Sequence, residues 1–162
     1  MTYSIVVRAE TVFGGLVVPR VRPSFKVSNG ELIEFLRDRL RDRGGTVLSD
    51  QGGTEPSDHG GTEAGRPLYT VYVPDPAGNY NVLIGYDYAS PDTVPVGDVL
   101  SRVPKGVYAR FEPNGDYHDP VEDVWAQVDD ATASAEITRA YREEIEIWRG
   151  VSAVELLISI LI

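Results

Sequence analysis

The sequence contains no cysteine, which excludes disulfide bonds, thiolate metal ligands and cysteine nucleophiles together. Only two histidines are present, His59 and His118, and they lie too far apart in the chain to indicate a metal site. The sequence also lacks a Gly-x-Ser-x-Gly nucleophile elbow, a dinucleotide-binding glycine pattern and a phosphate-binding loop that ends in Lys-Ser/Thr. We therefore expect no metal and no cofactor.

Long apolar runs are missing as well. No segment approaches the roughly 20 apolar residues that a membrane span needs, and the N-terminus lacks the basic start and long apolar core of a signal peptide. The formal net charge is −10, so phosphate backbones repel the chain. With 162 residues, of which 42% are hydrophobic, we expect a single cytoplasmic domain over 1–162 that contacts neither membranes nor nucleic acid directly.

Runs of β-forming residues predict most of the strands. A Pro/Gly turn at 75–79 joins two runs into a hairpin, and Gly150 joins the last two runs into another. The predicted strands cover 3–9, 15–21, 67–74, 81–88, 106–113, 142–150 and 152–162.

Two helices are predicted, and a third short one is expected over 133–144. The first begins at the capping pair Ser28-Asn29 and ends at Gly44-Gly45, with an apolar stripe on one side and its arginines outside. The second is capped by Asp119, with Pro120 at its first position. Three Gly-Gly-Thr repeats over 44–66 predict a flexible surface loop, in which His59 is solvated.

The order strand-helix-strand-strand occurs twice, in a first repeat of about 1–88 and a second of about 89–162. This order predicts an α+β fold of two βαββ repeats related by a pseudo-twofold axis. The helices would cover one face of an antiparallel sheet and leave the other face free for a ligand pocket.

The segment "REEIEIWRG" at 142–150 raises the functional question. Strand alternation places Ile145 and Ile147 on one face, and Glu144, Glu146 and Trp148 on the other. Glu146 then lies either on a solvated surface or in an aromatic pocket on the helix-free face. Trp148 and the nine tyrosines favour the pocket. Aromatic faces attract cations and stack on flat molecules, so the predicted ligand is large, flat, lipophilic and positively charged.

Several segments resemble the GyrI-like small-molecule-binding domain, the effector-binding module of multidrug-responsive bacterial regulators. These are "VPKGVYARFEPNGDY" (103–117), "VEDVW" (121–125), "EEIEIW" (143–148) and "AVELLISI" (153–160). The resemblance implies two strand-helix-strand-strand units and places Glu146 where the family has its pocket glutamate. The expected ligand-binding residues are Glu146, Trp148, Trp125, Tyr108, Tyr72, Tyr86, Tyr88 and Phe111.

Because no DNA-binding region precedes these segments, the resemblance implies a stand-alone binding module that captures lipophilic aromatic cations. Some members of the resembled family hydrolyse reactive cyclopropane-bearing natural products, so a hydrolase is an alternative, with Glu146 as general acid or base and Tyr108 or Trp125 positioning the substrate. A gyrase-inhibitor-like interaction protein is another. Binding is preferred because it needs only the pocket; the sequence identifies no protein partner.

Overall fold

The computed structural model describes residues 3–51, 66–150 and 153–162, and of 43–51 the backbone only. Eight strands in the described residues form one antiparallel sheet with the order β1-β6-β8-β7-β3-β4-β2-β5. In chain order they are β1 (Tyr3–Arg8), β2 (Thr11–Val21), β3 (Leu68–Pro74), β4 (Tyr80–Tyr88), β5 (Val99–Val103), β6 (Gly106–Phe111), β7 (Arg139–Trp148) and β8 (Val154–Ile160). The helices are α1 (Phe25–Ser28), α2 (Glu31–Gln51) and α4 (Pro120–Ala133), with a 3₁₀ turn, η1, at Pro91–Thr93.

The strand order is symmetrical about the central pair β3 and β7. Strands β4 and β2 follow on one side, and β8 and β6 follow on the other, so each βαββ unit supplies three adjacent strands. The outermost strands are exchanged: β1 pairs with β6 of the second unit, and β5 pairs with β2 of the first. The predicted α+β class and antiparallel sheet are confirmed.

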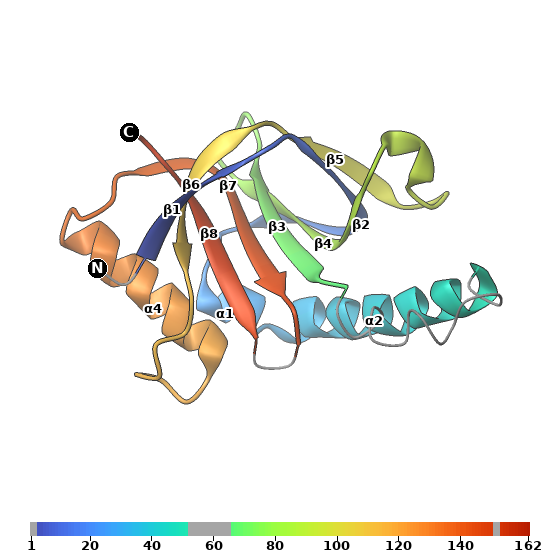
Figure 1. Ribbon diagram of the computed structural model, residues 1–162, viewed down its shortest axis with the longest axis horizontal. Coiled ribbons are helices and arrows are strands. Elements are labelled where there is room, and N and C mark those ends of the chain that lie inside the picture. Colours follow the sequence, from blue (N-terminus) through green and yellow to red (C-terminus); the bar gives the residue numbers. More distant parts are fainter. Residues whose placement is uncertain (1–2, 52–65, 151–152) are drawn as a thin grey trace.

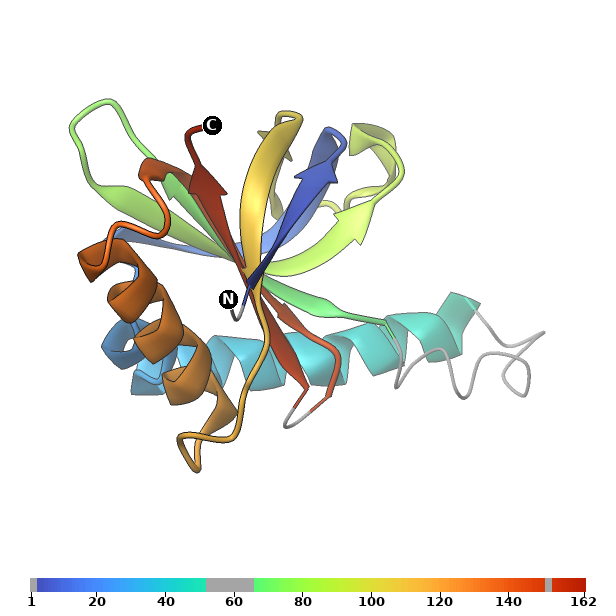
Figure 2. The same ribbon diagram turned by 60° about the vertical axis from the view of Figure 1, so that its left-hand side comes forward.

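Both faces of the sheet are buried. The three helices lie on one side of it, and the outer strands curve away on the other side (Figures 1 and 2). The helix-side cluster includes Tyr72, Val124, Trp125, Leu156 and Ile158. The opposite cluster consists of Phe13, Tyr69, Val71, Leu83, Val103, Tyr108, Ile145, Ile147 and Leu157. The curved sheet therefore covers its own helix-free face.

This arrangement corrects the expected orientation of β7. Ile145 and Ile147 belong to the helix-free cluster, whereas Glu146 hydrogen-bonds to side chains of α1 and α4. The glutamate and the helices are thus on the same side of the sheet. The alternation of side chains along a strand shows only which residues share a face of the sheet. The helix-free face would be exposed to solvent only if the sheet were flat. Here that face is filled by isoleucine, valine and aromatic side chains.

Helix α4 begins as predicted. The Asp119 side chain accepts a hydrogen bond from the backbone N–H of Val121 at 2.9 Å, and Pro120 takes the first helical position, where no N–H is needed. Its buried face, which includes Val124 and Trp125, packs on β6 and β8. The cap therefore fixes where Trp125 reaches the sheet.

Helix α2 differs from its prediction at both ends. Ser28 belongs to the preceding one-turn helix α1, which Ser24 caps, and α2 starts at Glu31. It continues through Gly44-Gly45 to Gln51, so the predicted end was wrong. A glycine inside a helix costs only about 1 kcal/mol, and it ends the helix only when it takes a left-handed conformation. The rest of the predicted loop, with His59, lies outside the described residues.

Three other elements also differ from expectation. The predicted short helix over 133–144 was wrong, because β7 already begins at Arg139. Strand β5 and the η1 turn were not predicted.

Inside the sheet, Gly15 and Gly85 are direct partners on β2 and β4, and a Cβ on Gly85 would lie 1.8 Å from the carbonyl oxygen of Gly14. Only glycine permits this close approach of two backbones.

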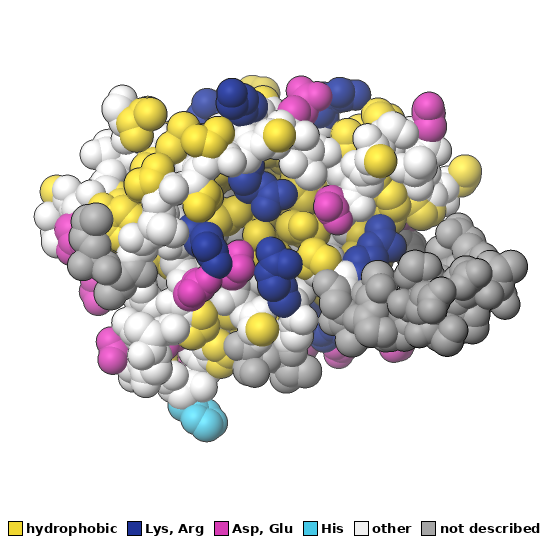
Figure 3. All heavy atoms as spheres, viewed as in Figure 1, with side chains coloured by type: hydrophobic (Ala, Val, Ile, Leu, Met, Phe, Trp, Pro, Cys, Tyr) yellow, Lys and Arg dark blue, Asp and Glu magenta, His cyan; other side chains and the backbone are white. Residues whose placement is uncertain are grey.

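The surface of the described residues is mixed. Figure 3 shows hydrophobic side chains exposed between basic and acidic ones on the face drawn in Figure 1. Within the described parts of the chain, no helix combines the length and apolarity that crossing a membrane requires. The same residues contain no group of three or more His, Asp or Glu side chains arranged to hold a metal ion.

Candidate functional site

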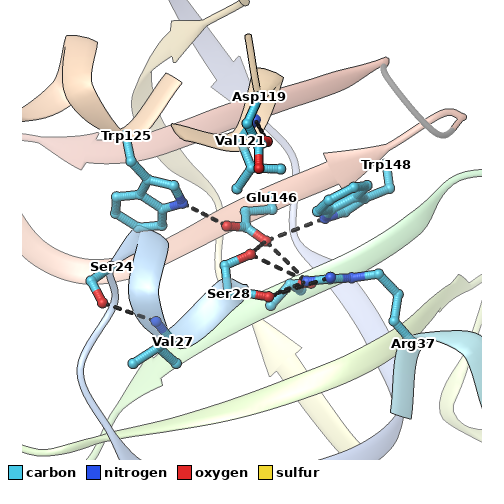
Figure 4. A network of polar contacts seen from close by, with 10 residues as sticks. Ser24, Val27, Ser28, Arg37, Asp119, Val121, Trp125, Glu146 and Trp148 are labelled. Carbon is cyan, nitrogen blue, oxygen red and sulfur yellow. Dashed lines mark hydrogen bonds and ion pairs between the residues drawn. The ribbon is translucent and has the colours of Figure 1, made fainter. Parts of the chain in front are cut away.

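Glu146 lies in the middle of β7 with its side chain completely buried. One carboxylate oxygen, Oε1, accepts hydrogen bonds from the Ser28 hydroxyl at 2.8 Å and the Trp148 indole nitrogen at 3.2 Å. The other, Oε2, accepts from the Trp125 indole nitrogen at 2.6 Å. Figure 4 shows the carboxylate between the two indoles. All three partners are donors, which suits an ionised carboxylate, since that group can only accept.

The positive charge near Glu146 comes from Arg37 of α2. A guanidinium nitrogen of Arg37 lies 3.5 Å from Oε1 of Glu146, and the guanidinium carbon lies 4.1 Å from the centroid of the Trp148 ring. Arg37 also donates to the Ser28 hydroxyl at 3.2 Å and to the Thr70 hydroxyl at 3.3 Å. Burial lowers the pKa of Arg37, and the Glu146 carboxylate opposes that shift.

A pocket of about 220 Å³ opens next to this cluster. Its wall combines the α1–α2 junction, the first turn of α4 and the end of β7. The lining residues are Ser28, Asn29, Glu34, Arg37, Arg41, Asp119, Pro120, Val121 and Trp148. Glu146 is not in the wall itself; it lies behind Ser28, Arg37 and Trp148.

Three of the predicted aromatic residues gather around Glu146. Trp148 lines the pocket, and Trp125 lies on the other side of the carboxylate. Tyr72 of β3 meets Trp125 edge-on, with ring centroids 5.9 Å apart. The Tyr72 hydroxyl is buried, and its interaction with the Ser28 side chain falls outside ordinary hydrogen-bond geometry. Burial first, and the charge of Glu146 second, raise the pKa of Tyr72 well above its usual value.

Three other predicted residues lie on the helix side but away from the pocket. The Tyr86 hydroxyl donates to the backbone carbonyl of Leu40 at 3.0 Å, and the Arg66 guanidinium covers the rings of Tyr86 and Tyr88. These two tyrosines are on β4, which β3 separates from β7. Phe111 packs on Tyr3 at 5.5 Å.

Tyr108 is on the wrong face of the sheet for the predicted role. It belongs to the cluster on the helix-free side, whereas Phe111 belongs to the helix-side cluster. The two residues are three positions apart on β6, and an odd spacing along a regular strand puts side chains on opposite faces. Tyr108 therefore cannot contact a ligand beside Glu146, and a substrate-positioning role for it there is excluded.

Sequence reasoning missed the polar partners Ser28, Arg37 and Thr70. The signal for Arg37 was present: it lies four residues after Ile33 and three before Leu40, both buried, so it shares their side of the helix. Arginines of this helix were assigned to the outside as a group. Thr70 is the direct cross-strand partner of Glu146, which only the register reveals.

The family model for integron-associated effector binding proteins matches residues 58–160, which is more than half of the chain. The chain belongs to this family. The match includes Trp125, Glu146 and Trp148, while Ser28 and Arg37 lie before it. Family membership, together with the fold, confirms the resemblance to GyrI-like effector-binding domains. No curated protein matches the sequence significantly.

Solved structures share the fold. The structure of SAV2435 bound to tetraphenylphosphonium has a TM-score of 0.68 and 13% identity, covering 99% of this chain and 94% of that one. The integron cassette protein VCH_CASS2 of Vibrio cholerae has a TM-score of 0.64 and 19% identity, covering 99% and 96%. A Staphylococcus aureus MU50 protein has a TM-score of 0.63 and 15% identity, covering 99% and 98%.

This effector-binding family member carries a second buried carboxylate on β7. Glu144 is fully buried and faces the helices, like Glu146. Arg139 contacts both of its oxygens at 2.7 Å. A bulge between Arg139 and Glu144 brings them to the same face, since their partners on β8 are Ile160 and Ile158. Burial raises the pKa of Glu144, and the Arg139 guanidinium partly opposes this.

Proposed function

We propose that this protein captures lipophilic aromatic cations in the pocket beside Glu146, with Trp148 as the stacking surface. One observation carries the proposal: a completely buried carboxylate is bordered by two indole rings and separated from the pocket only by Ser28, Arg37 and Trp148. Such a group has a strong need for positive charge, because an isolated ion inside a protein is costly.

The charges around the pocket mouth support a cationic ligand. Glu34 and Asp119 line the wall together with Arg37 and Arg41, and the buried Glu146 adds a third negative charge behind it. The Trp148 ring already carries a guanidinium on its face. The site therefore suits positive charge in combination with an aromatic surface.

The comparisons support the same ligand class. Tetraphenylphosphonium, the molecule bound to SAV2435, is a large aromatic monocation, and this chain shares that fold over 99% of its length. Recognition by ring stacking and one charge requires few directional hydrogen bonds. A site of this kind accepts ligands of different shapes, so we propose binding of multiple drugs and not of one metabolite.

The geometry favours binding over the alternative of hydrolysis. A general acid or base must exchange a proton with the substrate at hydrogen-bond distance. Both oxygens of Glu146 already accept from Ser28, Trp125 and Trp148, and the glutamate is behind the pocket wall. A charge that acts through space suits this position better than a proton-transfer group.

The test is a titration with tetraphenylphosphonium, followed by tryptophan fluorescence and calorimetry. The sequence has only two tryptophans, and both donate to Glu146, so the emission reports on the site. We expect a dissociation constant in the micromolar range, about −8 kcal/mol. Glu146→Gln should weaken this binding by about 10-fold or more, because one charge interaction of about 1.4 kcal/mol or more is lost.

Two controls isolate the charge. Triphenylphosphine oxide, a neutral aromatic analogue, should bind equally to the wild type and to Glu146→Gln. Glu10→Gln makes the same change in net charge at an exposed residue paired with Arg102, and it should leave tetraphenylphosphonium binding unchanged. Equal losses for the cationic and the neutral probe would disprove the role of Glu146.

A further inference from the structure

The two buried carboxylates of β7 are neutralised in very different ways. Arg139 contacts both oxygens of Glu144 at 2.7 Å, the usual length of a strong charged hydrogen bond. The nearest guanidinium nitrogen of Arg37 is 3.5 Å from Glu146. Since the two glutamates share a strand, a face and full burial, the difference comes from their arginines and not from their depth.

The polar contacts of Arg37 are all long. Its four hydrogen bonds to Ser28 and Thr70 are 3.2–3.4 Å long. Its Nε finds no acceptor among the described residues, although it is buried. A guanidinium normally offers five donors in a planar fork, and burying one without a partner is costly. This side chain therefore contributes far less stability than the number of its contacts suggests.

The features that surround this guanidinium are those expected for a ligand cation: the face of Trp148 and the charge of Glu146. We propose, on the basis of the proposed function, that Arg37 is an internal cation that occupies the ligand's place and is displaced when a lipophilic cation binds. Arg37 would thereby determine the affinity and the selectivity of the site.

The surroundings of Arg37 allow such a displacement. Its side chain forms part of the wall of the 220 Å³ pocket, so open space lies directly beside it. Glu34, one helical turn earlier on α2, lines the same pocket and can pair with the displaced guanidinium. The motion needs only side-chain rotation.

Competition with an internal cation explains which ligands would succeed. The apparent affinity of a ligand is its affinity for the free site multiplied by the fraction of molecules in which the site is free. A small hydrated ammonium ion gains little from Trp148 and loses its hydration shell, so it fails to displace Arg37. A large cation with a delocalised charge and apolar rings loses less hydration and gains more burial. Selection for lipophilic cations follows from the competition.

The experiment uses Arg37→Met, which removes the charge and keeps an unbranched side chain. We expect tetraphenylphosphonium to bind this variant about tenfold more tightly than the wild type, which corresponds to the removal of a competitor that is present most of the time. In a Glu146→Gln background the same substitution should change the affinity by less than about twofold, because the charge for which the two cations compete is gone.

Arg139→Met is the matched control. It removes an arginine from the other buried pair of β7, which lies outside the pocket, and it should leave the dissociation constant unchanged. If the wild type binds and Arg37→Met binds equally or more weakly, the displacement is disproved and the proposed function stands. If neither protein binds tetraphenylphosphonium or changes its fluorescence, the proposed function itself fails.

A measurement on the wild type serves if Arg37→Met does not fold. The side-chain Nε–H groups of Arg37 and Arg139 are observable by nitrogen-15 NMR, and each exchanges slowly with water while it is buried or hydrogen-bonded. Saturating tetraphenylphosphonium should abolish the slow exchange of Arg37 and preserve that of Arg139, whose Nε donates to Glu144 at 3.2 Å. Continued protection of Arg37 in the bound state would overturn the proposal.

Discussion

Glu144 and Glu146 are two residues apart on the same face of β7 and are both completely buried, yet only Glu144 receives direct charged hydrogen bonds from a guanidinium. The other carboxylate accepts from a hydroxyl and two indoles. Its nearest cation remains at 3.5 Å. Glu144 is neutralised by a strong ion pair, whereas the charge of Glu146 can still attract a second cation.

The ion pair between Glu144 and Arg139 leads to a prediction about pH. In Arg139→Met, the burial that raises the pKa of Glu144 is no longer opposed by the guanidinium. The folded state then binds a proton more readily than the unfolded state, whose glutamate titrates near about 4.3. The stability of Arg139→Met therefore falls as the pH rises from the pKa of the unfolded glutamate to the higher pKa of Glu144 in the folded state, and it recovers on acidification. We expect a loss of about 3–5 kcal/mol at pH 8, and a smaller loss at pH 5, in urea unfolding.

The double variant Arg139→Met/Glu144→Gln is the control for this prediction. It removes both charges, so no uncompensated ion remains in the core, and most of the lost stability should return. Its unfolding free energy should also change less between the two pH values than that of Arg139→Met, because glutamine at position 144 does not titrate. A double variant as unstable as Arg139→Met would show that packing, and not charge, causes the loss.

A second prediction concerns the Tyr72 hydroxyl. It is buried, its interaction with the Ser28 side chain falls outside ordinary hydrogen-bond geometry, and its raised pKa keeps it protonated. Removing a buried hydroxyl that is so weakly paired costs little, so Tyr72→Phe should unfold at nearly the same urea concentration as the wild type. Tyr86→Phe loses the bond to Leu40 and should cost about 1 kcal/mol. Similar losses in both variants would indicate a partner for Tyr72.

The class of the fold was predictable because it depends on local patterns. Asp119 and Pro120 mark the start of α4, and alternation correctly groups Glu144, Glu146 and Trp148 on one face of β7. The direction of that face was not predictable, since it depends on the curvature of the whole sheet. The side chains on both faces of β7 are buried, so their alternation alone cannot show which face the helices cover.

The composition of the site was only partly predictable. Glu146, Trp125 and Trp148 carry motif signals, and they meet in the structure. Arg37 comes from a helix more than 100 residues earlier, and its approach depends on how α2 packs on the sheet. Arg139 is five residues from Glu144, and regular alternation puts them on opposite faces; only the bulge in β7 reverses this.

The two tryptophans should respond differently to a ligand. Trp148 lines the pocket, whereas Trp125 is buried on the face of α4 that packs on the sheet and does not line the pocket. Trp125→Phe leaves Trp148 as the only tryptophan, and tetraphenylphosphonium should strongly change its emission. Trp148→Leu should bind about tenfold more weakly, because a cation–π contact worth about 0.5–2 kcal/mol is lost. Equal responses from the two single-tryptophan proteins would place the ligand elsewhere.

Asp119 combines two roles that substitutions can separate, since it caps α4 and lines the pocket. Asp119→Asn keeps a capping oxygen and loses the charge, so stability should stay the same; Asp119→Ala loses both and should cost about 1 kcal/mol in urea unfolding. Tetraphenylphosphonium should bind both variants a few-fold more weakly at low salt, because a partly exposed charge in the pocket wall attracts the cation. The difference from the wild type should shrink at about 1 M salt. If only Asp119→Ala binds more weakly, Asp119 acts by holding the first turn of α4 in place, and its charge has no part in recognition.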